Sequence, residues 1–498
     1  MTDKIKILES IALAIEKQNG QMFYVGGYVR DLILGRKNKD IDVEIHGIAV
    51  KDALTILESF GAVDKIGASF GVLKIKSLDI DFTFPRYESK SGDKHTDFDI
   101  NIDPYMGLHA AAKRRDFTMN AIMQNVLTKE IIDPFDGVID INDTLIRLVD
   151  PNTFLDDALR PLRAAQFAAR FGFDIDPDII KIAQTIDYSH LSKERVFEEL
   201  NKALLSPTPS IAFKYLYDMG ILQQVLPEVA ILSTIDQDPI HHPEGNVFNH
   251  TMMVLDEGAK LKDLVHEPLF FMWSCLLHDI GKAKDHFIDD DGHIRNNGHD
   301  ITGAKMVKPT LLRLTKQKKL TNYVEKMTRY HMRMHILLTM SDMKIKRIML
   351  DTDMLDLLFL NKADTYGRQT SPEKKESALM FDEKVKRIAG LSNDGFGVIT
   401  PMIQGKDLIR LGLEPGPEFK SILDHVFELQ LQDKPKFELE RYIHKKYVSD
   451  TSISIKNTDL IKLGYTPGPE FKYLIQRAFE LEQQGYTKKE ILQKLKPE

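Results

Sequence analysis

The stretch Tyr24–Gly47, YVGGYVRDLILGRKNKDIDVEIHG, decides the fold of the first part of this 498-residue chain. A short apolar run stops at two glycines, and Val29–Leu34 then reads as a brief helix. Glycine lets the backbone approach a phosphate closely, and the first N–H groups of a helix have no partner within it. Gly26 and Gly27 therefore predict an anion site, and Arg30 adds a positive charge there.

The segment that follows alternates like a strand and carries two aspartates. On a strand, residues i and i+2 face the same way, so Asp40 and Asp42 would present their carboxylates to one point. Mg²⁺ prefers a few carboxylates together with phosphate oxygens of a substrate. We therefore predict that Asp40 and Asp42 are catalytic residues and Mg²⁺ ligands. Asp81 lies on a later alternating run and is either a further carboxylate of this site or an ordinary edge-strand charge.

The order of these motifs resembles the signature of one enzyme family. GG-x-VRD, then LGR, then Asp-x-Asp is similar to the class II nucleotidyltransferases, which include the tRNA CCA-adding enzymes and the bacterial poly(A) polymerases. The segment 113–121, KRRDFTMNA, resembles the family's RRDFT-x-NA motif. This resemblance implies that Arg115 and Asp116 help to hold the phosphates and ribose of a nucleotide. The segment 132–137, IDPFDG, looks like the family's DPFDG turn.

From residue 147 the pattern becomes helical, and 154–173 reads FLDDALRPLRAAQFAARFGF. On a helix Asp157 and Arg160 are i and i+3, so they share a face and form either one hydrogen-bonding unit or a plain ion pair. As a unit, the carboxylate would accept from an exocyclic amine while the arginine donates to a ring nitrogen. Such a protein template accepts cytosine and adenine and rejects guanine and uracil.

The same segment resembles the EDxxR motif of the family. The matching residues, to which the resemblance assigns nucleotide binding, are Asp157, Arg160 and Arg163. Two positions depart from the family pattern: Asp156 replaces a glutamate and keeps the carboxylate, and Gln166 replaces a common arginine and removes a charge. The segment 192–205 resembles the next helix of the family, with Arg195 as its characteristic cation.

Most of the 16 histidines lie between residues 241 and 335. The adjacent pair His278-Asp279 follows an apolar run and can offer an imidazole nitrogen and a carboxylate oxygen to one metal ion. The pattern H…HD…D resembles the HD-domain metal-dependent phosphohydrolases. The ligands that this resemblance implies for a divalent metal of unknown identity are His250, His278, Asp279 and Asp364. It also implies that His299 and His331 line or extend the site, and that metal-bound water attacks a phosphate ester.

The last hundred residues contain a duplication. DLIRLGLEPGPEFK at 407–420 returns as DLIKLGYTPGPEFK at 459–472. Each copy predicts a helical hairpin, with a glycine and a Pro-Gly-Pro turn between two helices. The motif resembles the tail of some CCA-adding enzymes, and the second copy either extends an RNA-binding surface or packs against the first.

Length and composition narrow the class of protein. A chain of 498 residues exceeds a single hydrophobic core, which predicts several domains. The net charge of −7 argues mildly against a generic polyanion binder. No apolar run approaches the ~20 residues of a membrane span, and the first residues do not read as a signal peptide. With Cys275 as its single cysteine, the chain is expected to be cytoplasmic and free of internal disulfides.

We therefore predict an α/β nucleotidyltransferase head of the DNA polymerase beta type, with a small mixed sheet, followed by all-α domains. The chain should be mainly helical, elongated and multi-domain. The polar passage Tyr87–Pro104 is predicted to be a loop. The predicted domains are a head (1–143), a helical neck and body that recognises the base (144–238), an HD domain (239–372) and a helical tail (373–498).

The predicted function is template-independent addition of CMP and AMP to tRNA 3′ ends from CTP and ATP, with two Mg²⁺ ions. A poly(A) polymerase, or an enzyme that adds only CC or only A, is the alternative within the family. From another class, the alternative is an HD phosphohydrolase whose head binds nucleotide or RNA. A non-enzymatic RNA-binding protein is disfavoured because both carboxylate sites are complete. Membrane partners are not expected, and the oligomeric state is left open.

Overall fold

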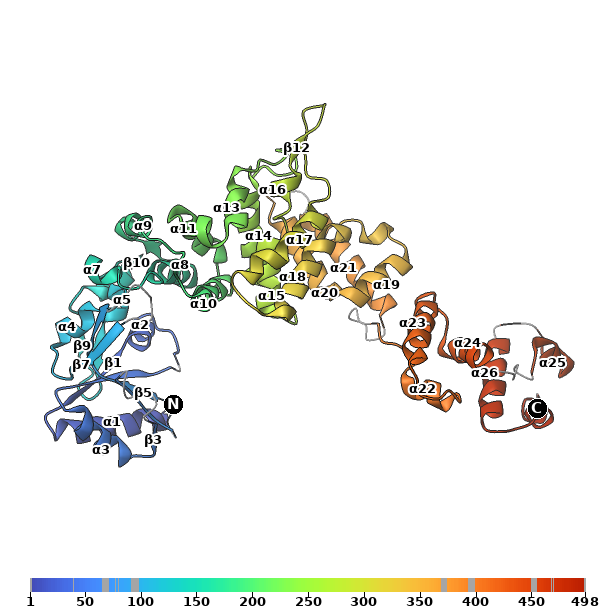
Figure 1. Cartoon of the computed structure of the whole chain (residues 1–498), viewed down its shortest axis with the longest axis horizontal. Coiled ribbons are helices and arrows are strands. Elements are labelled where there is room, and N and C mark those ends of the chain that lie inside the picture. Colours follow the sequence, from blue (N-terminus) through green and yellow to red (C-terminus); the bar gives the residue numbers. More distant parts are fainter. Residues whose placement is uncertain are drawn as a thin grey trace. The chain divides into compact units, whose positions relative to one another are not determined.

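The computed structural model describes residues 2–38, 40–64, 71–76, 78, 80–90, 98–368, 374–392, 399–448, 455–466, 468 and 470–496. The chain divides into two compact units. The first is Met1–His335 with Asp356–Phe381, and the second is Ile336–Leu355 with Asp382–Glu498. Helices dominate both units, and the one large sheet of the described residues lies in the head (Figure 1). The predicted fold class, an α/β head followed by helical domains, is confirmed.

The head is built on a seven-stranded mixed sheet with the order β3-β4-β5-β2-β1-β8-β9. Its strands are β1 (Gln21–Val25), β2 (Asp42–His46), β3 (Val63–Asp64), β4 (Val72–Ile75), β5 (Ile80–Thr83), β8 (Met123–Asn125) and β9 (Ile131–Ile132). Strand β2 pairs with β5 in parallel, and the other neighbours pair antiparallel. The parallel register sets Asp42 opposite Asp81, so both aspartates lie at the start of neighbouring strands.

Short helices cover the sheet and connect its strands. They are α1 (Thr2–Glu16), α2 (Gly27–Ile33), α3 (Val50–Glu58), α4 (Leu108–Lys113), α5 (Thr118–Ala121) and α6 (Gly137–Asn142). The fully buried Ile11 and Ile15 of α1 pack this helix onto the head. The loop predicted for Tyr87–Pro104 is wrong for half of its length. Strands β6 (Arg86–Lys90) and β7 (Phe98–Ile102) pair there as an antiparallel ladder, and 91–97 lie outside the described residues.

Helices follow the head in the neck and body. They are α7 (Pro151–Phe154), α8 (Arg160–Phe171), α9 (Pro177–Ala183), α10 (Lys193–Leu204), α11 (Pro209–Asp218), α12 (Ile221–Val225) and α13 (Pro227–Ala230). Two short strands, β10 (Leu145–Ile146) and β11 (Asp174–Ile175), pair in parallel beside them. The four buried alanines of α8 leave room for α10 and α11 to approach closely. Gly172, with φ of +74°, ends α8 in the left-handed conformation that glycine allows.

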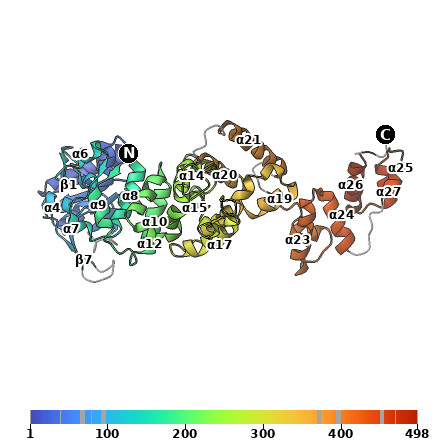
Figure 2. The ribbon, with the colours of Figure 1, turned by 90° about the horizontal axis from the view of Figure 1, so that it is seen from above.

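The histidine-rich region is a helical cluster around a buried group of imidazoles and carboxylates. Its elements are η2 (Ile231–Thr234), α14 (Val247–Leu261), η3 (Lys262–Leu264), α15 (Pro268–Leu277), α16 (Lys282–Asp285), β12 (Phe287–Ile288), β13 (Ile294–Arg295), α17 (His299–Leu312), α18 (Lys318–Tyr330), η4 (His331–Met334) and α20 (Met354–Tyr366). Helices α14 and α15 lie side by side in both views (Figure 1 and Figure 2). Trp273 of α15 stacks on Phe197 of α10 and donates its indole N–H to Asn201 (2.8 Å), which joins this cluster to the neck.

The second unit contains the duplicated tail. Its elements are η5 (Leu337–Thr339), α19 (Asp342–Asp351), α22 (Gly405–Arg410), α23 (Glu418–Leu431), α24 (Lys436–Tyr447), α25 (Asn457–Lys462), α26 (Glu470–Gln483) and α27 (Lys488–Lys494), and α21 (Lys374–Leu391) precedes the first copy. The hairpin of each copy is confirmed, and each copy adds a third helix. Asp407 and Asp459 cap the first helix of their copies through backbone N–H groups, and each pairs with a lysine of the third helix. Within the described ranges, none of the helices has both the length and the apolar character needed to cross a membrane.

Phe479 joins the two copies. It belongs to α26 of the second copy, yet its side chain, 4% exposed, lies in the apolar core of the first copy. His444 of α24 meets its ring edge-on at 6.2 Å. The two copies therefore pack against each other, which is one of the two interpretations that the sequence leaves open.

Phe479→Ala should destabilise the tail by about 3–5 kcal/mol, because it removes a buried aromatic side chain and leaves a cavity that the surrounding core fills only in part. Urea unfolding followed by circular dichroism measures this change, and Tyr473→Ala, at a 68% exposed position of the same helix, is the matched control. Equal unfolding midpoints for the two variants would show that the copies do not share a core.

Candidate active site and metal centre

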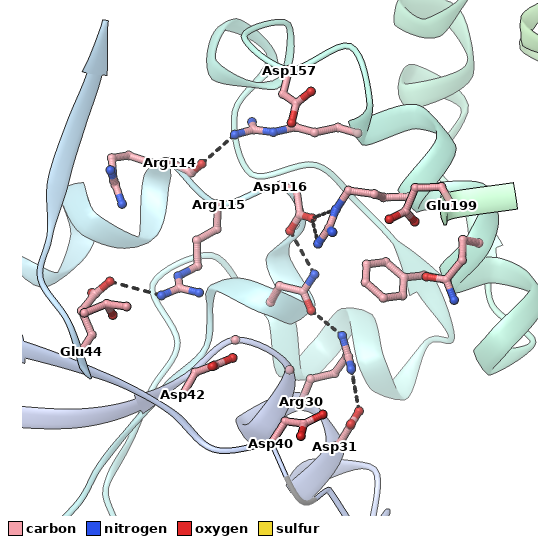
Figure 3. Close-up of a pocket in the computed structure, with 18 of the residues that line it drawn as sticks. Arg30, Asp31, Asp40, Asp42, Glu44, Arg114, Arg115, Asp116, Asp157 and Glu199 are labelled. Atoms are coloured by element: carbon pink, nitrogen blue, oxygen red, sulfur yellow. Dashed lines mark hydrogen bonds and ion pairs between the residues drawn. The ribbon is translucent and has the colours of Figure 1, made fainter. Parts of the chain in front are cut away.

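A pocket of about 1170 Å³ lies between the head and the first helices of the neck (Figure 3). The predicted site residues gather in it. Those that line it are Gly26, Gly27, Arg30, Asp40, Asp42, Arg115, Asp116, Asp157, Arg160 and Arg163. Gln166 also lines the pocket, as do Arg195, Glu199 and Lys202 of α10. Residues far apart in the sequence thus form one polar cavity.

Gly26 brings the Arg115 guanidinium close to the backbone before α2. Gly26 has φ of +63°, and a Cβ atom there would stand 3.1 Å from Nη1 of Arg115. Nη2 of Arg115 lies 3.3 Å from Oε2 of Glu44, which fixes the arginine above the glycine turn. A side chain at position 26 would therefore both strain the backbone and displace this cation.

Glu44 is a buried anion that the sequence reasoning did not single out. Its carboxylate lies 2.9 Å from Nε2 of His46 and pairs with Arg115. Burial raises its pKa, but the hydrogen bond from His46 and the charge of Arg115 outweigh burial and hold the pKa at about 2. Glu44 follows Asp42 by two positions on β2, so strand periodicity was the signal that could have found it.

Two neighbouring carboxylates act on Asp42 at the edge of the pocket. Asp42 begins β2, Asp40 precedes the strand, and Asp81 faces Asp42 on β5. The surrounding protein reduces the hydration of the Asp42 carboxylate, and this raises its pKa. The charge of Arg115 opposes the rise, whereas those of Asp81 and Asp40 add to it. Asp40 and Asp42 line a substrate-sized pocket, and their carboxylate oxygens fit a divalent cation with oxygen ligands.

A continuous hydrogen-bonded network joins the glycine turn to the neck. Arg30 donates to Asp31 through Nε (2.9 Å) and Nη2 (2.7 Å), and to Oδ1 of Asn120 through Nη1 (2.7 Å). Asn120 donates to Oδ1 of Asp116 (2.9 Å), and Oδ2 of Asp116 accepts from Arg163 (2.9 Å). Arg30 is 3% exposed, so its guanidinium lies behind the glycine turn with these N–H groups already used. Contact between Arg30 and a phosphate stays a prediction.

The network also sets the charge of Asp116. Burial raises the pKa of this carboxyl, but the charge of Arg163 and the hydrogen bonds from Asn120 and Arg163 lower it further than burial raises it. Asp116 is therefore an anion within the pocket wall. Asn120 stands in the KRRDFTMNA motif, but its link to Arg30, 90 positions away, could not be read from the sequence.

The expected Asp157–Arg160 unit on a helix is wrong. Helix α8 begins at Arg160, and Asp157 lies in the turn before it, where Oδ1 accepts from the Leu159 N–H (3.0 Å). Oδ2 of Asp157 pairs with Arg195 of α10 at 2.6 Å. Arg160 instead donates to the carbonyl oxygens of Thr153 (2.6 Å) and Arg114 (3.0 Å). Both side chains still reach the same pocket, from a turn and a helix start rather than from one helix face.

The histidine cluster forms a second polar centre within the same unit. The Nε2 atom of His250 lies 3.1 Å from Oδ1 of Asp364 and 3.8 Å from Oδ2 of Asp279. The Nε2 atom of His278 lies 3.3 Å from Oδ2 of Asp279. His250, His278 and Asp279 thus offer ligand atoms to one point, and Asp364 lies beside them through its contact with His250; all four residues are buried.

Two further histidines extend this cluster around Asp279. Oδ1 of Asp279 lies 3.2 Å from Nε2 of His299 and 3.5 Å from Nε2 of His331. Two groups of three ligand atoms, each within 4.8 Å of one another, therefore share Asp279. They are His250, His278 and Asp279, and Asp279, His299 and His331. Within the described residues, the buried Nε2 atoms of His250 and His278 have no hydrogen-bond partner, which fits nitrogen atoms that bind a metal ion.

Cations balance the carboxylates of this centre. Lys282 donates to Asp279 (2.6 Å) and to Gln237 (2.8 Å), and Arg368 lies 3.2 Å from Asp364. Burial raises the pKa of both aspartates, but neighbouring imidazoles, Lys282 and Arg368 outweigh it and hold both pKa values well below the usual range. Both groups are therefore carboxylates, as metal ligation requires.

Comparisons with known families agree with this geometry. The model of the poly(A) polymerase head domain matches residues 22–147, and that of the probable RNA- and SrmB-binding site of polymerase A matches 172–232. The HD domain model matches 247–376. The head and HD domains imply dependence on divalent metal ions.

Related proteins span most of the chain. A multifunctional CCA protein of Neisseria gonorrhoeae is 34% identical over 363 residues, which are 72% of this chain and 82% of the relative. One of Actinobacillus pleuropneumoniae is 30% identical over 362 residues, which are 70% and 86% of the two chains. The fold resembles the CCA-adding enzyme of Bacillus stearothermophilus in complex with CTP, with a TM-score of 0.61, 20% identity, and 87% and 94% of the chains covered. With its poly(A) polymerase head and its HD domain, the chain therefore belongs to the family of the multifunctional CCA proteins, the class II tRNA nucleotidyltransferases that its sequence resembles.

Proposed function

We propose that the chain adds CMP and AMP to the 3′ end of tRNA, using CTP and ATP and no nucleic-acid template. The observation that carries this proposal is a single pocket that holds paired carboxylates, a glycine turn under Arg115, and the base-reading candidates Asp157 and Arg160. Relatives named multifunctional CCA proteins, and neighbours solved with CTP, ATP or tRNA, support it. Enzymes that add only CC or A, or poly(A), remain the alternative within the family.

Asp40 and Asp42 are the proposed catalytic residues. Their oxygen donors fit Mg²⁺, which prefers a few carboxylates together with phosphate oxygens. When bound there, two Mg²⁺ ions would activate the RNA 3′-hydroxyl and neutralise the leaving pyrophosphate. Asp81 influences the pKa of Asp42 but pairs with Lys74 at 3.7 Å, so we assign it to the support of the site.

The remaining pocket residues position the nucleotide. Gly26 and Gly27 let the triphosphate approach the backbone, and Arg115 supplies the nearest partly exposed cation. Asp116 acts on the ribose, held in place by Asn120 and Arg163. Arg30 contributes its charge from behind the turn and orients Asn120.

Asp157 and Arg160 are the proposed readers of the base. The carbonyl oxygens of Thr153 and Arg114 fix the Arg160 guanidinium, and Arg195 fixes the Asp157 carboxylate. A fixed acceptor and a fixed donor match the amine and the ring nitrogen that cytosine and adenine share. Guanine and uracil present N–H groups where Arg160 would donate, so the same pair rejects them.

A second activity is favoured by the histidine cluster. We propose that His250, His278, Asp279 and Asp364 hold a divalent metal for hydrolysis of a phosphate ester, with His299 and His331 extending the site. The buried Nε2 atoms of His250 and His278, directed at carboxylates, support this proposal. The metal when bound would supply the activated water. Lys282 and Arg368 balance the charge of the carboxylates.

Asp42→Asn should reduce nucleotide incorporation into tRNA by about a hundredfold or more, because it removes a charge that stabilises the transition state through the metal. Release of p-nitrophenol from p-nitrophenyl phosphate should be unchanged. His278→Ala should have the reverse pattern, since it removes a ligand of the other centre. Loss of both activities in either variant would contradict two independent centres.

The fall in the rate of nucleotide incorporation at low pH should depend on the Mg²⁺ concentration. Since burial, together with the charges of Asp81 and Asp40, raises the pKa of Asp42, this carboxylate takes up a proton at a higher pH than an ordinary aspartate, and the protonated form cannot bind the cation. Activity should therefore fall as the pH is lowered, and added Mg²⁺ should move the midpoint to lower pH. Glu44, with a pKa of about 2, does not titrate in this range. If the midpoint of this fall in activity did not change with the Mg²⁺ concentration, a group other than Asp42 would cause it.

Asp157→Asn should weaken discrimination against UTP, because the amide offers N–H groups to the uracil carbonyl where the carboxylate only accepts. We expect incorporation of CMP relative to UMP to fall about tenfold, within the 1–3 kcal/mol of a good base contact. Competition assays with labelled CTP and UTP measure the ratio. Asp187→Asn, at an exposed aspartate outside the pocket, is the control. An unchanged ratio in Asp157→Asn would remove Asp157 from base readout.

A further inference from the structure

The four imidazoles of the histidine cluster are held through Nδ1 in two different ways. In His278, His299 and His331, Nδ1 lies 2.9, 2.7 and 2.7 Å from a backbone carbonyl oxygen. In His250, Nδ1 lies 3.0 Å from Oε1 of Glu244. A carboxylate only accepts, so Nδ1 of His250 carries the hydrogen and donates it. Among these four rings, His250 is the one supported by a full negative charge.

Glu244 is itself fixed in position. Its side chain is 1% exposed, and Oε1 also lies 2.8 Å from Nδ1 of His242. Its backbone carbonyl accepts from Asn249 (3.1 Å), and the segment closes through a backbone bond from Gln237 to Gly245 (3.1 Å). The carboxylate therefore cannot swing away from His250 without breaking several contacts.

The hydrogen bond from Nδ1 to Glu244 decides which nitrogen of His250 is left to bind a metal ion. With the hydrogen of His250 on Nδ1, the lone pair of the neutral ring is on Nε2, the atom that faces Asp364 and Asp279. A carboxylate behind a metal-binding imidazole fixes its tautomer and orientation and strengthens it as a ligand. Glu244 stands six positions before His250, ahead of the first residue of α14, so helix periodicity does not reveal the pair.

We propose that Glu244 is a positioning residue that holds His250, through a carboxylate–imidazole hydrogen bond, as a ligand of the divalent metal in the histidine cluster. His242 holds the Glu244 carboxylate from its other side. This inference rests on the proposed metal site and deepens it. Loss of Glu244 should cost about 10–100-fold in metal affinity, the range that such supporting contacts contribute.

The test is a Co²⁺ titration of the full chain, followed by calorimetry and by visible absorption of the bound ion. It is made in an Asp42→Asn background, which weakens the metal site of the head. Glu244→Gln keeps the shape but removes the charge, and Glu257→Gln is the matched control on α14, where Glu257 pairs with Lys260 outside the cluster. We expect Co²⁺ to bind Glu244→Gln about 10–100-fold more weakly and Glu257→Gln unchanged. Equal affinity in Glu244→Gln and its parent overturns the proposal.

His278→Ala separates the failure of this inference from that of the metal site. If His278→Ala binds Co²⁺ as its parent does, the proposed metal site itself is wrong. If His278→Ala loses the ion while Glu244→Gln keeps full affinity, only the role of Glu244 is wrong.

A spectroscopic measurement on the parent protein does not depend on how Glu244→Gln folds. In the Zn²⁺-loaded parent labelled with ¹⁵N-histidine, His250, assigned by its loss in His250→Ala, should bind the ion through Nε2 and keep its hydrogen on Nδ1. An Nε2–H tautomer for His250 would overturn the proposal.

Discussion

The pocket depends on one constraint, that the buried charge of Arg30 must be paired. An unpaired charge inside a protein costs several kcal/mol, so the guanidinium holds its partners wherever the chain brings them from. Asp31 comes from the same helix, whereas Asn120 comes from α5. Through Asn120 the network continues to Asp116 and to Arg163 of α8. This network therefore holds the glycine turn of the head at a fixed position relative to α8, the helix that begins at the base-reading candidate Arg160.

The histidine cluster also pairs buried charges, but here the buried charges are negative. Asp279 and Asp364 are buried anions, and imidazoles, Lys282 and Arg368 surround them. This network of paired charges is stable. It also gathers more nitrogen and oxygen atoms able to bind a metal than the packing of a helical core requires, which is the arrangement expected of a metal centre. The stack of Trp273 on Phe197 places it in the same compact unit as the nucleotide pocket.

Local sequence signals predicted much of the fold and the candidate site. The glycine turn, the strand that starts at Asp42 and the duplicated tail each depend on neighbours in the chain, so their patterns could be read directly. The helix expected through Asp157 failed because Pro161 occupies its first turn, where proline starts helices.

Long-range contacts were beyond the reach of those patterns. The strands β6 and β7 stabilise each other by pairing, although their polar sequences suggested a loop. Asn120 and Glu244 act through partners that only the folded chain brings near. The most direct test of the account is to incubate the purified protein with Mg²⁺ and tRNA transcripts that lack the last three nucleotides, lack only the terminal adenosine, or are complete. With CTP and ATP supplied singly and together, we expect addition of C, C and A followed by a stop. A long ladder of A alone, or no incorporation, would contradict the proposed function.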